Sequence, residues 1–316
     1  MTTSSGPAAP APAPAPPAGA APPSMDARSW ALLVLLSLLW GGAFFFAGVA
    51  VREVPPMTVV FFRVLIAALA LLPLFFAAGL ALPRTPSAWT PFLMMGLLNN
   101  VLPFGFLFAG QTYVSVGLAA IINALTPLFT VLVMAGFKEE RLTAYRVIGV
   151  LLGVIGVAVL RGIDGAASGA QTIGIGLCMA GALSYGFAGL WGRRHLSGIA
   201  PLKSATCQLM GSTLIMGLIV AVYDQPWTLD APSIGTIGAI VALALFGTAL
   251  AYIVFFEILV RAGASNVMLV TLLIPVSAML LGHAFLNEAI RTQDILGALI
   301  IGAGLLFIDG RWLPKR

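Results

Sequence analysis

The sequence is poor in the residues that hydrate a protein surface and in those that form covalent or metal cross-links. Only 9% of its 316 residues are charged, whereas soluble domains carry about 25%. It has 2 histidines and 2 cysteines. So few charges cannot build a water-facing surface, which excludes a soluble globular domain and a disordered chain. Cys178 and Cys207 form no CxxC pattern and lie in apolar segments, so we expect both to be buried.

The sequence also lacks the motifs of catalytic and metal chemistry. It contains no HExxH, no cysteine–histidine cluster, no paired aspartates, no Ser–Lys dyad at helical spacing and no P-loop. An ATP-driven pump is excluded and a membrane enzyme is disfavoured, and we expect no metal and no cofactor. The 16 lysines and arginines form no dense cluster, so we expect no nucleic-acid partner.

What the sequence has in abundance is apolar residues, which make up 60% of the chain. A Pro/Ala-rich tail at 1–26 cannot bury a core, and we expect it to be disordered. Beyond it, apolar segments of about 18–25 residues follow one another, each long enough to cross the roughly 30 Å core of a lipid bilayer as a helix. The sequence predicts an all-α integral membrane protein with ten transmembrane helices at 30–51, 57–79, 88–110, 113–136, 143–161, 172–192, 202–223, 233–257, 264–286 and 293–310.

The basic residues indicate how such a chain is oriented. With the N-terminus in the cytoplasm, 12 of the 16 lysines and arginines fall on the cytoplasmic side and 3 on the other, and Arg63 lies within a helix. Cytoplasmic connectors are enriched in basic residues. We therefore expect a bacterial inner-membrane protein with both termini in the cytoplasm.

The two halves of the chain align with each other. At an offset of 148 residues, Pro127 matches Pro275 and Glu140 matches Glu288. Five helices in each half is an odd number, so the second half must insert upside down. Inverted repeats of this kind are typical of secondary transporters, whose substrate site lies near the bilayer midplane. The expected units are a first repeat at 27–161 and a second at 162–316.

Several segments, in this order and spacing, carry a family resemblance. They include LLWGGAFFFAG at 38–48 and PPMTVVFFRVLIAALAL at 55–71, followed by 117–157, 182–190, 246–256 and 263–304. The chain resembles the EamA family of the drug/metabolite transporter superfamily over about residues 28–308. The resemblance implies two inverted EamA units around a central cavity, with export or exchange of small metabolites, often amino acids.

Arg63 is the foremost candidate for substrate binding. It lies about seven residues into its helix, or on the order of 10 Å deep. An arginine at that depth costs roughly 2.5–3.5 kcal/mol to insert, so it must face protein, water or a partner. It could bind a substrate carboxylate, or it could hold neighbouring carbonyl groups of the bundle. The equivalent residue of the second half is Gln208.

Two prolines predict breaks in their helices. Pro127 and Pro275 each lack the N–H that would bond the carbonyl four residues earlier, at Asn123 and Thr271. One hypothesis makes these carbonyls and side chains substrate ligands and the breaks hinges for alternating access. The alternative is a packing kink whose carbonyl is satisfied by a hydroxyl.

Further polar and aromatic side chains lie deep in the expected helices. Asn99 and Asn100 face different directions, so one is expected to face the cavity and the other to bond a neighbouring helix. Trp40, Tyr185 and Tyr252 are candidates for stacking on substrate, with core packing as the alternative. None of the expected helices carries a central acid, and we expect no carboxylate-based proton relay in the membrane.

The glycines of the fifth and tenth helices predict close helix packing. Gly149 and Gly153 form a GxxxG pattern that Gly297, Gly302 and Gly304 echo. The pattern fits packing within one chain and packing between two, so a homodimer remains an alternative.

These observations favour a secondary transporter of small metabolites, and among these an amino-acid exporter. Within the same fold, a nucleotide-sugar-like anion or a drug is the alternative substrate. A membrane channel or a lipid-modifying membrane enzyme is the alternative from another class.

Overall fold

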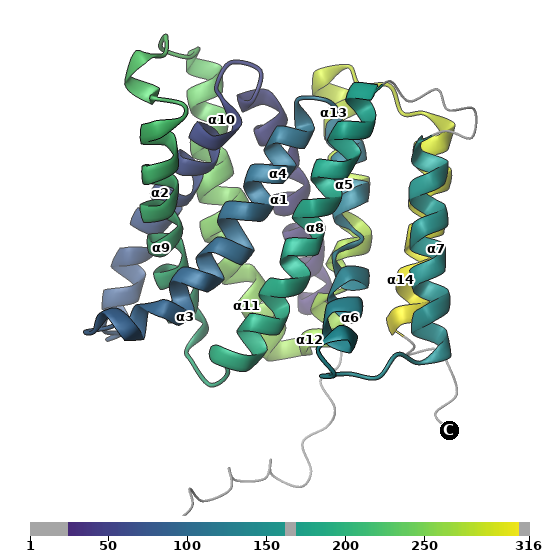
Figure 1. Ribbon diagram of the computed structural model, residues 1–316, viewed down its shortest axis with the longest axis horizontal. Helices are drawn as coiled ribbons and strands as arrows, with labels where there is room; N and C mark the ends of the chain where they lie inside the picture. The colour runs from purple at the N-terminus through teal and green to yellow at the C-terminus, as the bar shows by residue number, and fades with distance from the viewer. Residues whose placement is uncertain (1–24, 162–168, 310–316) are drawn as a thin grey trace, which may run out of the picture.

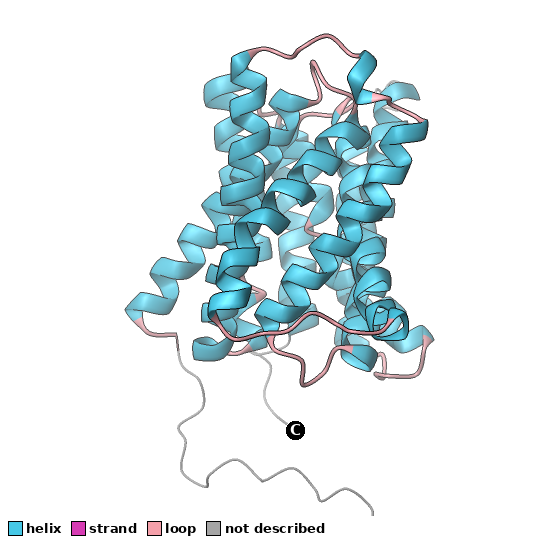
Figure 2. Ribbon diagram, turned by 90° about the vertical axis from the view of Figure 1, so that its left-hand side faces the viewer, coloured by secondary structure: helices cyan, strands magenta, loops and turns pink. Residues whose placement is uncertain are grey.

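The computed structural model describes residues 25–161 and 169–309, and these residues are helical without a strand (Figures 1 and 2). The first half contains α1 (Ala27–Ala50), α2 (Pro56–Ala77), α3 (Pro86–Gly96), η1 (Leu97–Val101), α4 (Leu102–Gln111), α5 (Val116–Asn123), α6 (Thr126–Gly136) and α7 (Ala144–Arg161). The second half contains α8 (Gly169–His195), α9 (Pro201–Val222), η2 (Pro226–Thr228), α10 (Ile234–Ala244), η3 (Leu245–Leu250), α11 (Ala251–Ala262), α12 (Ala264–Val267), α13 (Val270–Leu286) and α14 (Thr292–Asp309). Residues 1–24 of the expected tail and residues 310–316 lie outside the described residues.

Local chemistry explains where several helices begin. Asp26 accepts a hydrogen bond from the Ser29 amide at 2.8 Å and caps α1. Ser115 and Ser233 cap α5 and α10 in the same way. Side-chain oxygens at these positions satisfy backbone N–H groups that have no partner within the helix. Proline at the first residue of α2 and of α9 adds a preset backbone angle.

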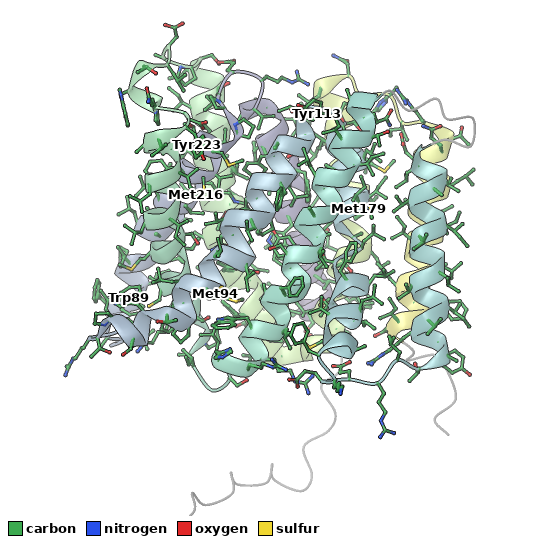
Figure 3. All side chains as sticks on the ribbon, viewed as in Figure 1. Trp89, Met94, Tyr113, Met179, Met216 and Tyr223 are labelled. Atoms are coloured by element: carbon green, nitrogen blue, oxygen red, sulfur yellow. The ribbon has the colours of Figure 1, made fainter. Side chains whose placement is uncertain are left out.

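The described helices suit a membrane by length and composition. Eight helical stretches are long and apolar enough to cross it, and two shorter apolar helices, Ala144–Leu160 and Val270–Leu286, accompany them. Carbon covers the sides of the bundle, and nitrogen and oxygen gather at its two ends (Figure 3). Trp89 lies near one end, and Tyr113 and Tyr223 near the other, as expected of interfacial aromatic residues. The chain is a multi-pass membrane protein.

Four expected helices are internally irregular. The segment expected as one helix at 113–136 is divided at Ala124 and Leu125, and the segment at 264–286 is divided at Met268 and Leu269. The third and eighth segments contain π-helical stretches, η1 and η3. The eighth also continues past Glu257 to Ala262, and the helical spacing lets Arg261 form an i,i+4 ion pair with Glu257.

Helices α7 and α14 form a pair at one edge of the bundle (Figure 1). The glycines make this pairing close: a Cβ on Gly149 would lie 2.6 Å from the Gly304 carbonyl oxygen, and one on Gly304 would lie 2.8 Å from that of Gly149. The glycine pattern thus packs two helices of the same chain.

Carboxylates join the two halves at the end where Asp224 lies. Asp224 accepts from the amide of Thr58 at 2.8 Å, and Glu53 accepts from the amide of Ser233 at 2.7 Å. Glu288 accepts from the amide of Val116 at 3.0 Å. Each carboxylate of one half thus receives a hydrogen bond at the start of a helix of the other half, where the helix dipole favours negative charge.

Ion pairs join the two halves at the opposite end. Arg194 pairs with Glu139 at 2.7 Å, and Arg193 pairs with Glu140 at 3.1 Å. Arg146 pairs with Glu140 as well, at 2.8 Å. Arg28 and Glu257 approach to 3.4 Å across the same boundary. The two halves of the chain are thus joined by carboxylates on helix starts at one end of the bundle and by ion pairs at the other.

Candidate functional site

The centre of the candidate site is Arg63, which α2 places in the interior with 6% of its surface exposed. Its Nε donates to the hydroxyl of Thr248 at 2.9 Å, and its Nη2 donates to the carbonyl of Gly247 at 3.4 Å. The guanidinium carbon lies 3.5 Å from the centre of the Phe104 ring and 5.5 Å from that of Phe108. Aromatic faces and backbone oxygen thus hold this cation where bulk water does not reach.

No carboxylate neutralises Arg63 within the described part of the chain, where the ion pairs gather near the ends of the bundle. A guanidinium has five N–H donors in a planar fork, and two of its bonds to protein are defined here. A buried charge without a partner is costly. The geometry therefore provides a cation suited to an anionic ligand.

Gln208 of α9 makes the corresponding contact in the other half. Its side-chain oxygen accepts from Asn99 Nδ2 at 3.2 Å, and Asn99 also donates to the Tyr252 hydroxyl at 3.3 Å. Tyr252 donates to Asn100 Oδ1 at 3.3 Å, and Asn100 donates to Ser212 at 2.9 Å. Three helical stretches, η1, α9 and α11, are thus joined by one polar network. Asn100 is fully buried and Asn99 half-buried. Both bond α9 and Tyr252, so the assignment of one of them to the cavity stays a prediction.

The contacts that Arg63 and Gln208 make with the opposite half of the chain follow one pattern. Arg63 bonds η3, which starts at residue 245, and Gln208 bonds η1, which starts at residue 97. The two π-helical stretches thus begin 148 residues apart, the offset at which the halves align. Residue 63 of the first half therefore reaches the second half, and residue 208 of the second half reaches the first. π-Helical turns are rare and frequently mark functional sites.

Tyr185 and Trp40, which occupy equivalent positions, have different surroundings. The phenol groups of Tyr185 and Tyr252 interact electrostatically with Arg63, which places both close to the cation. Trp40 packs against Phe255, with ring centres 5.7 Å apart. All three expected aromatic candidates are half-buried.

Within the described residues, the proline-linked residues form no hydrogen bond with Arg63 or with the polar network of Gln208. Pro127 is the second residue of α6, a position where the missing N–H costs nothing. The Asn123 carbonyl accepts from the hydroxyl of Thr126 at 2.8 Å, as the packing alternative predicts. Asn123 Oδ1 is buried, and no described residue bonds to it.

Pro275 does not end a helix. It lies inside α13, and the irregularity comes earlier, at Met268 and Leu269. The Thr271 hydroxyl donates to the Met268 carbonyl at 2.7 Å. Thr271 and Pro275 both line an apolar cavity of about 560 Å³ against α14. α13 continues through Pro275 although the ring has no N–H to bond the Thr271 carbonyl, and a hinge at this residue stays a prediction.

Sequence reasoning missed Thr248, Ser212 and the two π-helical stretches. Hydroxyl side chains in the middle of apolar helices were the available signal for the first two. The π-helical stretches left no signal in the periodicity, because helices that are apolar on every face show no 3.6-residue pattern. Among the described residues, no group of three or more His, Cys, Asp or Glu side chains could hold a metal ion.

Comparison with known proteins agrees with this architecture. An uncharacterised transporter of Archaeoglobus fulgidus is 25% identical over 89% of this chain and 98% of its own length. A protein of Salmonella typhimurium named "Probable amino-acid metabolite efflux pump" is 26% identical over 89% of this chain and 94% of its own.

One crystal structure is 20% identical, has a TM-score of 0.62 and covers 90% of this chain and 96% of its own, which supports the fold. The model of the EamA-like transporter family matches residues 28–162 and 172–309. These two matches together account for most of the chain, which therefore belongs to the EamA-like transporter family.

Proposed function

We propose that this protein is a secondary transporter that exports amino acids or closely related carboxylates. In this proposal ten membrane-spanning segments form two inverted five-segment repeats, and both termini lie in the cytoplasm of a bacterial cell. The first and last described helices, α1 and α14, have their outer termini at the same end of the bundle (Figure 1). One relative is named for amino-acid metabolite efflux, which supports this choice of substrate.

The buried Arg63 is the observation that carries the proposal. A substrate carboxylate would take the place of the missing counter-ion and use the free donors of the guanidinium in a bidentate contact. The remaining polar atoms of the same substrate would then face the phenols of Tyr185 and Tyr252 and the amide of Asn99. A purely cationic drug is disfavoured, because like charges repel strongly where the dielectric constant is low.

The connections between the halves fit alternating access. Substrate would reach Arg63 from one end after the carboxylate caps at Asp224, Glu53 and Glu288 open, and from the other after the Arg–Glu pairs open. Because both sets join the first half to the second, a rocking motion of the halves would open one set while the other stays closed. A channel would need both to open together.

Counterflow in proteoliposomes tests the proposal. Vesicles loaded with unlabelled amino acids are expected to take up one or a few labelled amino acids in a saturable way. Arg63→Ala should reduce uptake about 10- to 100-fold, the usual range for losing a charge-assisted bond. Arg63→Lys, which keeps the charge and loses the planar fork, should recover part of it, and Arg52→Ala, an exposed arginine between α1 and α2, should match wild type.

Three results would contradict the proposal in different ways. Uptake that Arg63→Ala leaves unchanged would return Arg63 to a structural role. Absence of uptake by folded protein for every amino acid would reject the substrate class, and nucleotide-sugar-like anions would be tried next. Flux that never saturates would indicate a channel.

A further inference from the structure

The cavity of about 560 Å³ lies apart from Arg63, between α14 on one side and α5 and α13 on the other. We call it the α13–α14 groove. Thr271, Pro275 and Met279 line it from α13, and Ala298, Gly302 and Leu306 line it from α14. The one hydroxyl in its lining, that of Thr271, already donates to the Met268 carbonyl at 2.7 Å. The rest of the lining is apolar, so the groove offers little to a polar substrate.

The groove is open toward the sides of the bundle. Val276 and Leu280 on α13 are 55% and 59% exposed, and Leu299 on α14 is 65% exposed. These side chains lie in membrane-spanning segments, where exposure means contact with lipid. The surroundings of the groove are therefore acyl chains.

The length of the groove matches one leaflet. Its lining on α14 runs from Ile295 to Leu306, which is about 16 Å at a rise of 1.5 Å per residue. Half of the roughly 30 Å hydrocarbon core is about 15 Å. An extended acyl chain that reaches from the headgroups to the middle of the bilayer has this length.

A cationic side chain, that of Arg291, lies at the end of the groove. Ile290 lines the groove, and the next residue, Arg291, is exposed and has no ion pair within the described ranges. The nearby carboxylates are engaged by backbone: Asp294 accepts from the Arg291 amide at 3.0 Å, and Glu288 accepts from the Val116 amide at 3.0 Å. The guanidinium can therefore meet a phosphate at the level of the lipid headgroups.

We propose that the α13–α14 groove binds one acyl chain of a phospholipid from the leaflet on the Arg291 side, with the headgroup phosphate at Arg291. The lipid would fill the space between the α7–α14 pair and the rest of the bundle. This site is independent of the transported substrate.

A photoactivatable phosphatidylglycerol, with a diazirine on one acyl chain, tests the proposal on purified full-length protein. After illumination, peptides from α13 and α14 should carry most of the label. Gly302→Leu should remove this labelling, because a Cβ there has room, 3.7 Å from Leu272, and a longer side chain enters the groove. Gly176→Leu is the matched control, since Gly176 has no neighbour within 4 Å and lies on another face.

The headgroup contact has its own pair of variants. Arg291→Gln should weaken labelling about fivefold, the usual effect of one basic residue at an anionic surface. Arg52→Gln, exposed at the same end of the bundle, should not. Label spread evenly over the helices, or lost equally in Gly176→Leu, would overturn the proposal.

Discussion

At the residue scale, adjacent glycines of α1 differ in what surrounds them. A Cβ on Gly41 would lie 2.1 Å from the Ser277 hydroxyl oxygen and 3.0 Å from the Ala278 amide nitrogen, whereas one on Gly42 would meet only the Phe46 ring at 3.7 Å. The Ser277 hydroxyl also donates to the Ser37 carbonyl at 2.7 Å. Gly41 is therefore the residue that permits close packing of α1 on α13.

We predict that Gly41→Ala destabilises the protein and that Gly42→Ala does not. Overpacking at a tight contact costs about 1–3 kcal/mol, and the Ser277 hydroxyl bond to α1 would be lost with it. Thermal unfolding in detergent measures the effect, with a lower Tm expected for Gly41→Ala alone. Equal Tm values for the two variants would show that the helices can separate without cost.

Glu53 predicts a dependence on pH. The pKa of its carboxyl lies below the ordinary value because the carboxylate accepts from the amide and the hydroxyl of Ser233. Such a group stabilises the folded protein above its unfolded pKa, and the contribution is lost as the pH falls through the folded pKa. Wild type should therefore exceed Glu53→Gln in Tm at pH 7, and the difference should shrink as the pH falls below the ordinary glutamate pKa of about 4.3. A difference that stays constant across this acid range would contradict the prediction.

At the scale of elements, each π-helical stretch is hydrogen-bonded to a side chain from the other half of the chain. The Thr248 hydroxyl in η3 donates to the Leu243 carbonyl, five residues earlier, at 3.2 Å and accepts from Arg63 at 2.9 Å. One hydroxyl therefore both completes the wider turn and orients the cation. The position of Arg63 depends on the shape of η3.

We predict that Thr248→Val loses stability and transport together. The valine has the same shape but leaves Arg63 Nε without its acceptor, which costs about 1–3 kcal/mol for a buried group. Thr213→Val is the matched control, because the Thr213 hydroxyl bonds only the Leu209 carbonyl of its own helix at 2.8 Å. Tm and counterflow report the two effects, and identical behaviour of the two variants would deny Thr248 a role in positioning Arg63.

At the scale of the whole molecule, the two ends of the bundle hold the halves together through opposite arrangements. One end uses carboxylates on helix starts, and the other uses ion pairs of the Glu139 and Glu140 connector with α8. Exposed ion pairs contribute little individually, about 0–1 kcal/mol each. Such weak connections can open and close within a transport cycle.

We predict that neutralising the repeat-related acids shifts the conformational equilibrium in opposite directions. Glu140→Gln weakens two ion pairs and should favour opening at its end, and Glu288→Gln weakens the cap of α5 and should favour opening at the other. Each change should alter populations about two- to fivefold. Distances between spin labels, Arg141 with Lys203 at one end and Arg52 with Tyr223 at the other, measure the shifts. Shifts in the same direction would argue against alternation.

Much of the architecture follows from the sequence alone. The scarcity of charge and the length of the apolar segments predict a helical membrane protein, because only internally bonded helices suit such segments in lipid. The repeat offset and the quoted segments predict the family. Arg63 is a candidate from the sequence because a charge at that depth is costly wherever it points.

The tertiary structure decided which polar residues meet. Arg63 and Thr248 are 185 residues apart, and Asn99 and Gln208 are 109 apart, so no local pattern joins them. Thr271 and Pro275 resemble site residues in the sequence but line an apolar groove instead. In apolar helices, periodicity does not distinguish a face toward lipid from one toward protein, since both are hydrophobic. Only the packing of the helices determines that choice.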